Sequence, residues 1–218
     1  MHGDADHSRD TESGIIQPTI RRIGIADYNE TWIAMRTFTE ARMPGDPDQI
    51  WLLQHPPVYT MGLNAKHRPF AGGRDITLVQ TDRGGDITYH GPGQLVAYVL
   101  MDLRRHNLGP KGLVHRLEQA VIDLLHAYGI GGCRHTGAPG VYVGNRKIAQ
   151  LGLRIRRGCS YHGLALNVSM DLRPFNDIDP CGYPGLEVTQ LADLVSVDSL
   201  QAVETALLDA LLGNLSYN

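Results

Sequence analysis

The chain has 218 residues and a formal net charge of −3, and 42% of its residues are hydrophobic and 20% charged. This composition predicts a globular domain with a sizeable core, and the lack of a basic excess excludes a general nucleic-acid-binding protein. No apolar run approaches the roughly 20 residues of a membrane-spanning helix. The three cysteines form no CxxC pair, so neither a disulfide framework nor a structural zinc site is predicted. We therefore expect a cytoplasmic protein without a membrane or nucleic-acid partner.

The two ends of the chain differ in character. Residues 1–17 are polar and contain no apolar segment, which indicates a flexible tail rather than a signal peptide. We expect residues 18–218 to form one domain. A small helical subdomain beginning at about residue 186 is the alternative arrangement for its C-terminal part.

Strands and helices alternate along the first part of the chain. Residues 18–28 predict a strand, and Asp27 with Glu30 predicts a capping box that opens a helix. Residues 49–62 predict two strands interrupted by a pair of prolines, and residues 75–82 predict another short strand.

The alternation continues in the second part of the chain. Residues 93–103 are apolar at successive positions and predict a buried central strand. Residues 112–129 predict the clearest helix, because apolar residues recur at helical spacing up to Gly129. The remaining expected elements are a hairpin over residues 140–157 that turns at Gly144 and Asn145, a strand over residues 159–171, and a helix over residues 199–212 capped by Asp198. Together these elements predict an α+β fold with a mixed sheet flanked by helices.

The stretch RGGDITYHGPGQL, residues 83–95, concentrates glycines and polar side chains. Gly84 and Gly85 permit close approach of the backbone to another group, and the Gly-Pro-Gly that follows predicts a sharp turn. One interpretation is an exposed hairpin, and the other is a substrate wall with backbone N–H groups facing a ligand. The stretch lacks the lysine of a phosphate-binding P-loop and the spacing of a dinucleotide fingerprint, so neither of those sites is predicted.

Lys147 is one of only three lysines and begins a stretch of alternating apolar residues. On a strand it would head the apolar face. Its amine then either reaches solvent from the strand end or is buried, and burial disfavours the charged form of an amine.

Cys181 lies in a loop of turn-forming residues, NDIDPCGYPG. A thiol near a basic group in such a loop is a candidate nucleophile, whereas the alternative is a surface or packing cysteine. The ten histidines show no metal-ligand spacing, so we expect no metal site, and no G-x-S-x-G sequence indicates a serine hydrolase.

Three stretches in this order resemble the lipoyl(octanoyl) transferase family: residues 83–95, GNRKIAQLGLRI followed by HGLALNVSMDL, and FNDIDPCGY. WLLQHPPVYTMG also resembles the early strand pair of that family, and the resemblance spans roughly residues 20–210. It implies one catalytic domain with the fold of biotin and lipoate protein ligases. It also implies an acyltransferase that moves an octanoyl or lipoyl group from acyl carrier protein to a lysine of a lipoyl domain, without a cofactor.

The resemblance also implies the site residues. The nucleophilic thiol of the family falls on Cys181 and its catalytic lysine on Lys147. The family's substrate-binding segments fall on Arg83, Gly84, Gly85, Asp86, Ile87, Thr88, Tyr89, His90, Gln150, Leu151, Gly152, Gly163, Leu164 and Ala165. Gln150 and Leu151 stand where the family more usually shows alanine and isoleucine, which bears on the detail of the pocket rather than on activity.

The implied mechanism passes through an acyl-cysteine thioester on Cys181, with Lys147 as the general base for the second half of the reaction. Backbone N–H groups near Gly182, or those of Gly84 and Gly85, are the candidates for an oxyanion hole. We expect Tyr89 and His90 to shape the mouth of the pocket.

The implied partners are octanoyl-acyl carrier protein as donor, and as acceptors the lipoyl domains of 2-oxoacid dehydrogenase complexes and the glycine cleavage carrier protein. We expect a monomer. Because these partners are acidic, a basic docking rim is expected. Its candidate residues are Arg104, Arg105, Lys111, Arg156 and Arg157.

Two alternatives remain at this point. One is an ATP-dependent lipoate or biotin protein ligase, which shares the fold but needs a phosphate-gripping loop and no nucleophilic cysteine. The other is a non-enzymatic module that binds acyl carrier protein or lipoyl domains.

Overall fold

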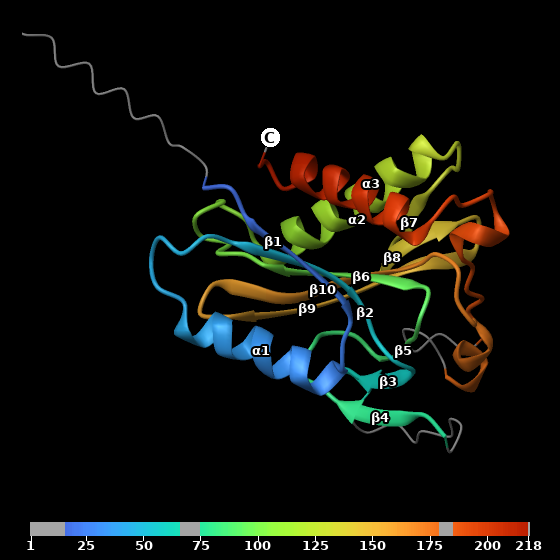
Figure 1. Cartoon of the computed structure of the whole chain (residues 1–218), viewed down its shortest axis with the longest axis horizontal. Helices are drawn as coiled ribbons and strands as arrows, with labels where there is room; N and C mark the ends of the chain where they lie inside the picture. Colours follow the sequence, from blue (N-terminus) through green and yellow to red (C-terminus); the bar gives the residue numbers. More distant parts are fainter. Residues whose placement is uncertain (1–15, 66–74, 179–184, 218) are drawn as a thin grey trace, which may run out of the picture.

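The computed structural model describes residues 16–65, 75–178 and 185–217, which form two sheets and three α-helices (Figure 1). The larger sheet has seven strands in the order β1-β2-β6-β10-β9-β8-β7, and a smaller sheet has the order β4-β3-β5. The strands of the larger sheet are β1 (Thr19–Ile25), β2 (Gln49–Gln54), β6 (Gln94–Leu100), β10 (Cys159–Asn167), β9 (Arg146–Arg156), β8 (Ala138–Val143) and β7 (Cys133–His135). Those of the smaller sheet are β3 (Val58–Met61), β4 (Thr77–Gln80) and β5 (Ile87–His90).

Both sheets are mixed, as predicted. β1 pairs with β2 in parallel and β3 with β4 in parallel, whereas the other pairings are antiparallel. The two strands predicted on either side of the proline pair, β2 and β3, belong to different sheets. The proline pair therefore moves the chain from one sheet to the other.

Helices cover the two faces of the larger sheet (Figure 1). Helices α2 (Pro110–Ala127) and α3 (Leu200–Asn214) pack on one face, and α1 (Tyr28–Ala41) lies on the other face, where the smaller sheet is also found. Two short 3₁₀-helices, η1 (Arg173–Asp177) and η3 (Leu191–Asp193), lie between β10 and α3. The inner cavity described below is on the side of α1.

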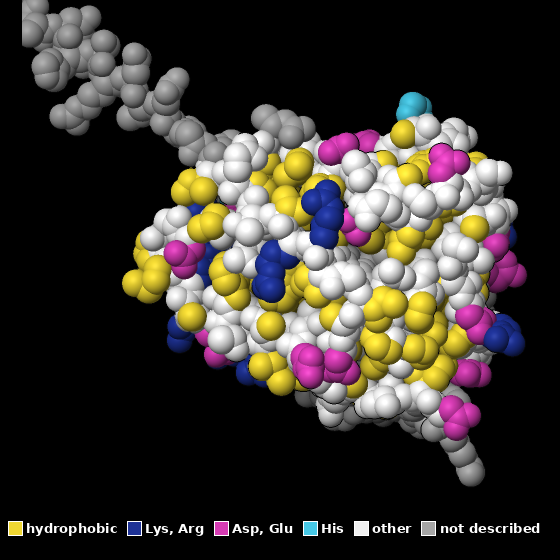
Figure 2. All heavy atoms as spheres, viewed as in Figure 1, with side chains coloured by type: hydrophobic (Ala, Val, Ile, Leu, Met, Phe, Trp, Pro, Cys, Tyr) yellow, Lys and Arg dark blue, Asp and Glu magenta, His cyan; other side chains and the backbone are white. Residues whose placement is uncertain are grey.

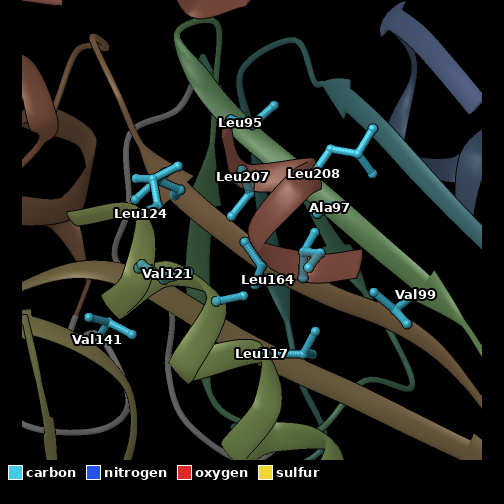
Figure 3. Packing of buried hydrophobic residues seen from close by; sticks show 14 of the residues in the cluster. Leu95, Ala97, Val99, Leu117, Val121, Leu124, Val141, Leu164, Leu207 and Leu208 are labelled. Atoms are coloured by element: carbon cyan, nitrogen blue, oxygen red, sulfur yellow. The ribbon is translucent and has the colours of Figure 1, made fainter. Parts of the chain in front are cut away.

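The central strand β6 explains this layering, because all seven of its residues are buried. Alternate side chains of a strand point to opposite faces of the sheet. Leu95, Ala97 and Val99 join the cluster formed with α2 and α3 (Figure 3), whereas Val96 and Tyr98 join a second cluster on the side of α1. The prediction of a buried central strand is therefore confirmed.

The N-cap of α1 agrees with the prediction, whereas the N-cap of α3 differs from it. The Asp27 side chain accepts a hydrogen bond of 3.0 Å from the Glu30 amide, so α1 begins where the pattern predicted. The predicted cap of the last helix, Asp198, is wrong. Ser199 is the N-cap, and its hydroxyl oxygen accepts from the Ala202 amide at 3.1 Å. The prediction chose the earlier of two adjacent residues that both cap helices well.

Helix α3 contributes Val203, Leu207 and Leu211 to the cluster that contains the central strand and α2. The division of the chain into domains stays a prediction. None of the helices among the described residues is long and apolar enough to cross a membrane.

Asp48, just before β2, joins several segments that are distant in sequence. Its side chain is 2% exposed and accepts a hydrogen bond from His106 Nε2 at 2.7 Å. Its other donors are Arg42, Arg105, the Asp102 amide and the Tyr217 hydroxyl. The carboxylate thereby ties the C-terminal end of the chain to the start of a central strand.

Candidate functional site

A partly open cavity of about 50 Å³ lies between the larger sheet and the segment that runs into β5. It is lined by Tyr28, Arg83, Gly85, Asp86, Ile87, Thr88, His90, Val96, Tyr98, Gln150, Leu151, Gly152, His162, Gly163, Leu164 and Ala165. Every residue expected at the substrate pocket lines this cavity except Gly84 and Tyr89. The three expected stretches, residues 83–90, 150–152 and 163–165, therefore meet around one space.

The floor of the cavity is made by neighbouring strands of the larger sheet. In the β9–β10 pairing, Gly152 lies opposite Gly163 and Gln150 lies opposite Ala165. A Cβ atom on Gly152 would lie 3.0 Å from the Gly84 carbonyl oxygen, and one on Gly163 would lie 2.0 Å from the Ala97 carbonyl oxygen. Glycine at these two positions is therefore a steric requirement of the close packing around the cavity.

The segment that covers Gly152 is held in place by two kinds of hydrogen bond. The Gly84 amide donates to the Leu153 carbonyl oxygen at 2.8 Å, which fixes the segment on β9. The Arg83 guanidinium is buried and donates to the Thr60 carbonyl oxygen at 2.6 Å and to the Gly84 carbonyl oxygen at 2.9 Å. Because its N–H donates to β9, Gly84 is not an oxyanion-hole donor in this structure, which leaves Gly85 as the candidate of the pair.

His90 forms part of the wall through a relay of hydrogen bonds. Its Nδ1 lies 2.7 Å from Gln94 Oε1, and Gln94 Nε2 donates to Asn167 Oδ1, so the histidine Nδ1 carries the proton. Its Nε2 lies 3.4 Å from the Thr60 hydroxyl. Complete burial holds the pKa of His90 well below its usual range, so the ring is neutral at pH 7.

Tyr89 does not shape the mouth of this cavity, contrary to the prediction. Its ring packs against Tyr59 and Phe175, with centroids 5.5 and 5.6 Å away, in a separate cluster. Successive residues of β5 point to opposite sides, so Thr88 and His90 take one side and Tyr89 the other.

His162 reaches the cavity through an unusual backbone conformation. Its φ of +62° is in the left-handed region, which non-glycine residues rarely adopt, and its ring stacks on that of Tyr161 at 5.1 Å between centroids. His162 Nε2 lies 3.3 Å from Asp82 Oδ1, and the Tyr161 hydroxyl and Trp32 Nε1 also donate to Asp82. Burial raises the pKa of Asp82, but these hydrogen bonds together hold that pKa well below its usual range.

Burial also governs the other histidines beside the cavity. It lowers the pKa of His162, although Asp82 opposes the shift, and it lowers the pKa of His55 to about 4. His55 Nδ1 donates to the Ala26 carbonyl oxygen at 2.7 Å, so its Nε2 accepts from the Tyr98 hydroxyl at 2.8 Å. Neutral rings of this kind suit an uncharged ligand.

Sequence reasoning did not place Tyr28, Val96, Tyr98 or His162 in the pocket. Val96 and Tyr98 alternate on the central strand and lie opposite Ala165 and Gly163, so the period of two was the signal that could have found them. Nothing in the local sequence of Tyr28 indicates that it reaches the cavity.

Lys147 is fully buried, which resolves the alternatives left open by its position on a strand. Its Nζ donates a hydrogen bond of 2.7 Å to the Pro139 carbonyl oxygen and lies 5.3 Å from the centroid of the Tyr142 ring. A Cβ atom on Gly140 would come within 2.3 Å of Lys147 Cε, so glycine at 140 leaves the space that the side chain fills.

The main chain of Lys147 pairs with residues that follow the Cys181 segment. The Lys147 amide donates to the Glu187 carbonyl oxygen, and the Thr189 amide donates to the Lys147 carbonyl oxygen, each at 2.9 Å. Cys181 and Gly182 lie outside the described residues. Of the described cysteines, Cys133 is exposed and Cys159 is buried, and neither lines the cavity.

A second hollow of about 470 Å³ adjoins the first and shares Gly85, Asp86, Leu151 and Gly152 with it. We call it the groove. Its other lining residues are Asn64, Gly84, Pro110, Lys111, Val114, Gly137, Ala138, Pro139, Leu153 and Ile155. Lys147 lines neither space, but its hydrogen-bond partner Pro139 lines the groove, so the buried amine lies directly behind the groove wall.

The residues expected to form a basic rim have different surroundings. Lys111 is exposed and lines the groove. Arg104 and Arg105 form ion pairs with Asp102 and Asp48, and Arg156 pairs with Glu40. The Arg157 guanidinium lies 3.5 Å from the Glu40 carbonyl oxygen. On the face shown in Figure 2, basic and acidic side chains are interspersed.

Within the described ranges, no group of three or more His, Cys, Asp or Glu side chains is arranged to hold a metal ion.

Comparisons with known proteins agree on one family. The profile of the lipoyl protein ligase A/B catalytic domain matches residues 27–212. The chain is 56% identical over 192 residues to an octanoyltransferase of Thiobacillus denitrificans, with 88% of each chain covered. It is 59% identical over 175 residues to an octanoyltransferase of Laribacter hongkongensis, covering 80% of this chain and 84% of the relative.

The fold agrees with solved structures at much lower identity. A crystal structure of lipoate-protein ligase A bound with ATP superposes with a TM-score of 0.74 at 17% identity, covering 92% of this chain and 86% of that one. The predicted fold class is confirmed. The chain belongs to the lipoyl protein ligase A/B catalytic domain family.

Proposed function

We propose that the protein is an octanoyltransferase that moves an octanoyl or lipoyl group from acyl carrier protein to a lysine of a lipoyl domain, through a thioester on Cys181. The observation that carries the proposal is the meeting of the expected acyl-binding segments around one cavity, which shares four lining residues with a groove backed by Lys147. The octanoyltransferase relatives, which match most of this chain, support it.

The inner cavity is too small to hold a whole octanoyl chain. An engineered cavity of about 150 Å³ binds benzene, whereas the inner cavity measures about 50 Å³. An eight-carbon chain therefore extends from the groove through the shared junction at Gly85 and Gly152, with its distal part in the cavity. The neutral histidines beside the cavity match the uncharged chain.

The first half-reaction forms the acyl-enzyme. The Cys181 thiolate attacks the thioester carbonyl, a new C–S bond forms, and the bond to the carrier breaks, so that the carrier thiolate leaves and takes up the proton of cationic Lys147, which becomes neutral. A cationic Lys147 near the thiolate favours its formation. The Gly85 N–H is a donor for the oxyanion that develops on the carbonyl oxygen.

The second half-reaction transfers the acyl group to the acceptor. The neutral amine of the target lysine attacks the carbonyl of acyl-Cys181, an amide bond forms and the Cys181 thiolate leaves. Lys147 takes the proton that the attacking amine loses. Because the thioester on Cys181 is as energy-rich as the thioester of the donor, the transfer needs no ATP.

The ATP-dependent ligase is the less supported alternative. The lipoate-protein ligase structure that superposes on this chain is only 17% identical, which shows the fold alone, whereas relatives above 50% identity are octanoyltransferases.

The proposal also covers the partners and the setting of the reaction. The acceptors are the lipoyl domains of 2-oxoacid dehydrogenase complexes and the glycine cleavage carrier protein. The protein acts as a monomer in the cytoplasm.

The deciding experiment mixes the protein with octanoyl-acyl carrier protein in the absence of ATP and measures its intact mass. We expect an octanoyl increment that is lost in Cys181→Ser and retained in the matched variant Cys133→Ser, since Cys133 is exposed and lines neither space. Addition of a lipoyl domain is expected to move the increment to that domain. Transfer that requires ATP would establish the ligase, and an unchanged rate in Cys181→Ala would exclude the acyl-cysteine.

A further inference from the structure

Gln150 places a carboxamide in the wall of the inner cavity. The residue is 6% exposed and lies opposite Ala165 in the β9–β10 pairing. Neither its Nε2 nor its Oε1 has a hydrogen-bond partner among the described residues. Three other residues of this lining are in the same state. The Tyr28 hydroxyl, the Thr88 hydroxyl and Nδ1 of His162, on residues that are 3%, 8% and 1% exposed, have no partner in the described part of the chain either. Buried polar atoms are nearly always paired, so four such residues around one space indicate a built feature.

With entry from the groove, these four residues lie at the inner end of the site. They line the cavity but not the groove, whereas Gly85 and Gly152 line both and mark the junction. A chain that enters from the groove passes the junction first. Its distal carbons are therefore the part that approaches Gln150.

The unpaired atoms are both donors and acceptors. His162 Nε2 is directed at Asp82, so Nδ1 of the neutral ring is an acceptor. The Gln150 amide offers a donor and an acceptor, and so does the Thr88 hydroxyl. An alkyl chain has neither a hydrogen-bond donor nor an acceptor. Methylene groups that cover these polar atoms therefore exclude water from them and provide no hydrogen bond in its place, which costs free energy.

We propose that Gln150 is a specificity-determining residue that, with Tyr28, Thr88 and His162, forms a polar end to the acyl cavity and thereby limits the acyl chain to medium length. The inference rests on the proposed octanoyl transfer and adds to it the feature that excludes longer chains. The whole cavity, with the junction residues included, measures about 50 Å³, which leaves room for only a short stretch of alkyl chain before these atoms are reached.

The test separates polarity from size. Gln150→Leu removes the hydrogen-bonding groups at nearly constant volume, and Gln150→Ala also enlarges the cavity. Each variant is given an equimolar mixture of octanoyl- and dodecanoyl-acyl carrier protein, and the two acyl-enzyme masses are compared. In both variants we expect the ratio of dodecanoyl to octanoyl product to rise about tenfold over the wild type, because the longer chain no longer has to cover an unpaired buried amide.

Gln201→Leu is the matched control, because Gln201 is an exposed residue on α3. It should leave the ratio unchanged. An unchanged ratio in both Gln150 variants, a shift in Gln150→Ala alone, or an equal loss with both donors would overturn the proposal. If Gln150→Leu does not fold, Gln150→Met replaces it with the same expected shift.

Failure of the proposed function is recognised separately. If the wild type forms no acyl-enzyme with either donor, the same comparison is made by titrating sodium octanoate and sodium dodecanoate calorimetrically. The polar end then predicts that the ratio of the two dissociation constants shifts about tenfold toward dodecanoate in Gln150→Leu, and no shift overturns it.

Discussion

Lys147 Nζ donates its hydrogen bond to the Pro139 carbonyl oxygen, 2.7 Å away, so a buried amine is held directly behind the wall of the groove. An amine in this place can both carry and release a proton, whereas a guanidinium keeps its charge. The substitution Lys147→Arg tests this difference.

In Lys147→Arg we expect acylation of Cys181 to continue at a reduced rate and transfer to the lipoyl-domain lysine to fall about 10²–10⁴-fold, the usual contribution of a positioned acid or base. Single-turnover measurement of the two half-reactions separates them. Lys111→Arg, an exposed residue of the groove, is the control. Equal loss in both half-reactions would show that Lys147 acts through position alone.

Gly152→Ala should close the junction between the groove and the cavity. The added Cβ would lie 3.0 Å from the Gly84 carbonyl oxygen and 3.1 Å from Arg83 Cδ, so the covering segment has to shift. We expect loss of octanoyl transfer and a fall of about 1–3 kcal/mol in the free energy of unfolding. The control is Gly131→Ala, where the added atom meets nothing within 4 Å and should change neither quantity. Full activity in Gly152→Ala would show that the acyl chain takes another route.

His55 should make the protein less stable at acidic pH. Burial lowers its pKa from 6.5 to about 4, so between these values the unfolded chain binds a proton that the folded chain does not. Its contribution is complete above pH 6.5 and is lost as the pH falls toward 4, on the order of 3 kcal/mol in total. Urea unfolding between pH 7 and pH 4.5 measures this loss.

The variant His55→Asn is expected to flatten the pH dependence, while the exposed variant His126→Gln should keep it. His90 and His162 titrate in the same direction, because burial lowers the pKa of each, so part of the slope is expected to remain. A slope that His55→Asn leaves unchanged would mean that His55 is not a source of the acid sensitivity.

Asp48→Asn should destabilise the fold by about 3–5 kcal/mol, because it leaves buried cationic partners such as Arg42 without their carboxylate. Hydrogen bonds, led by that of Tyr217, outweigh burial and lower the pKa of Asp48, so its contribution is present at neutral pH and is lost as the pH falls through that pKa. Thermal unfolding at pH 7 and at about pH 2 measures both effects. Asp171→Asn, at an exposed ion pair with Arg173, should leave the midpoint unchanged.

Patterns of short range predicted the fold well. The helix start at Asp27 and the buried run of β6 each depend on neighbouring residues, and both were confirmed. The separation of β2 and β3 into two sheets was not predicted, because it depends on pairings with distant strands.

The residues of the pocket were predicted from the resemblance to a family, and the geometry explains which of these predictions were wrong or incomplete. Tyr89 belongs to the matching stretch but faces another cluster, because strand alternation turns it away. His162 enters the cavity through a φ of +62°, which no periodicity indicates. The unpaired atoms of Gln150 follow from tertiary packing, and residue type alone does not reveal them.

The backbone pairing of Lys147 with residues 187–189 makes amide hydrogen exchange a local reporter of the site. The Lys147 and Thr189 amides lie in the same ladder, so both lose protection together whenever residues 187–189 detach from β9. Their exchange rates, compared with and without bound octanoate, would show whether the chain that follows the Cys181 segment stays attached while the site is occupied.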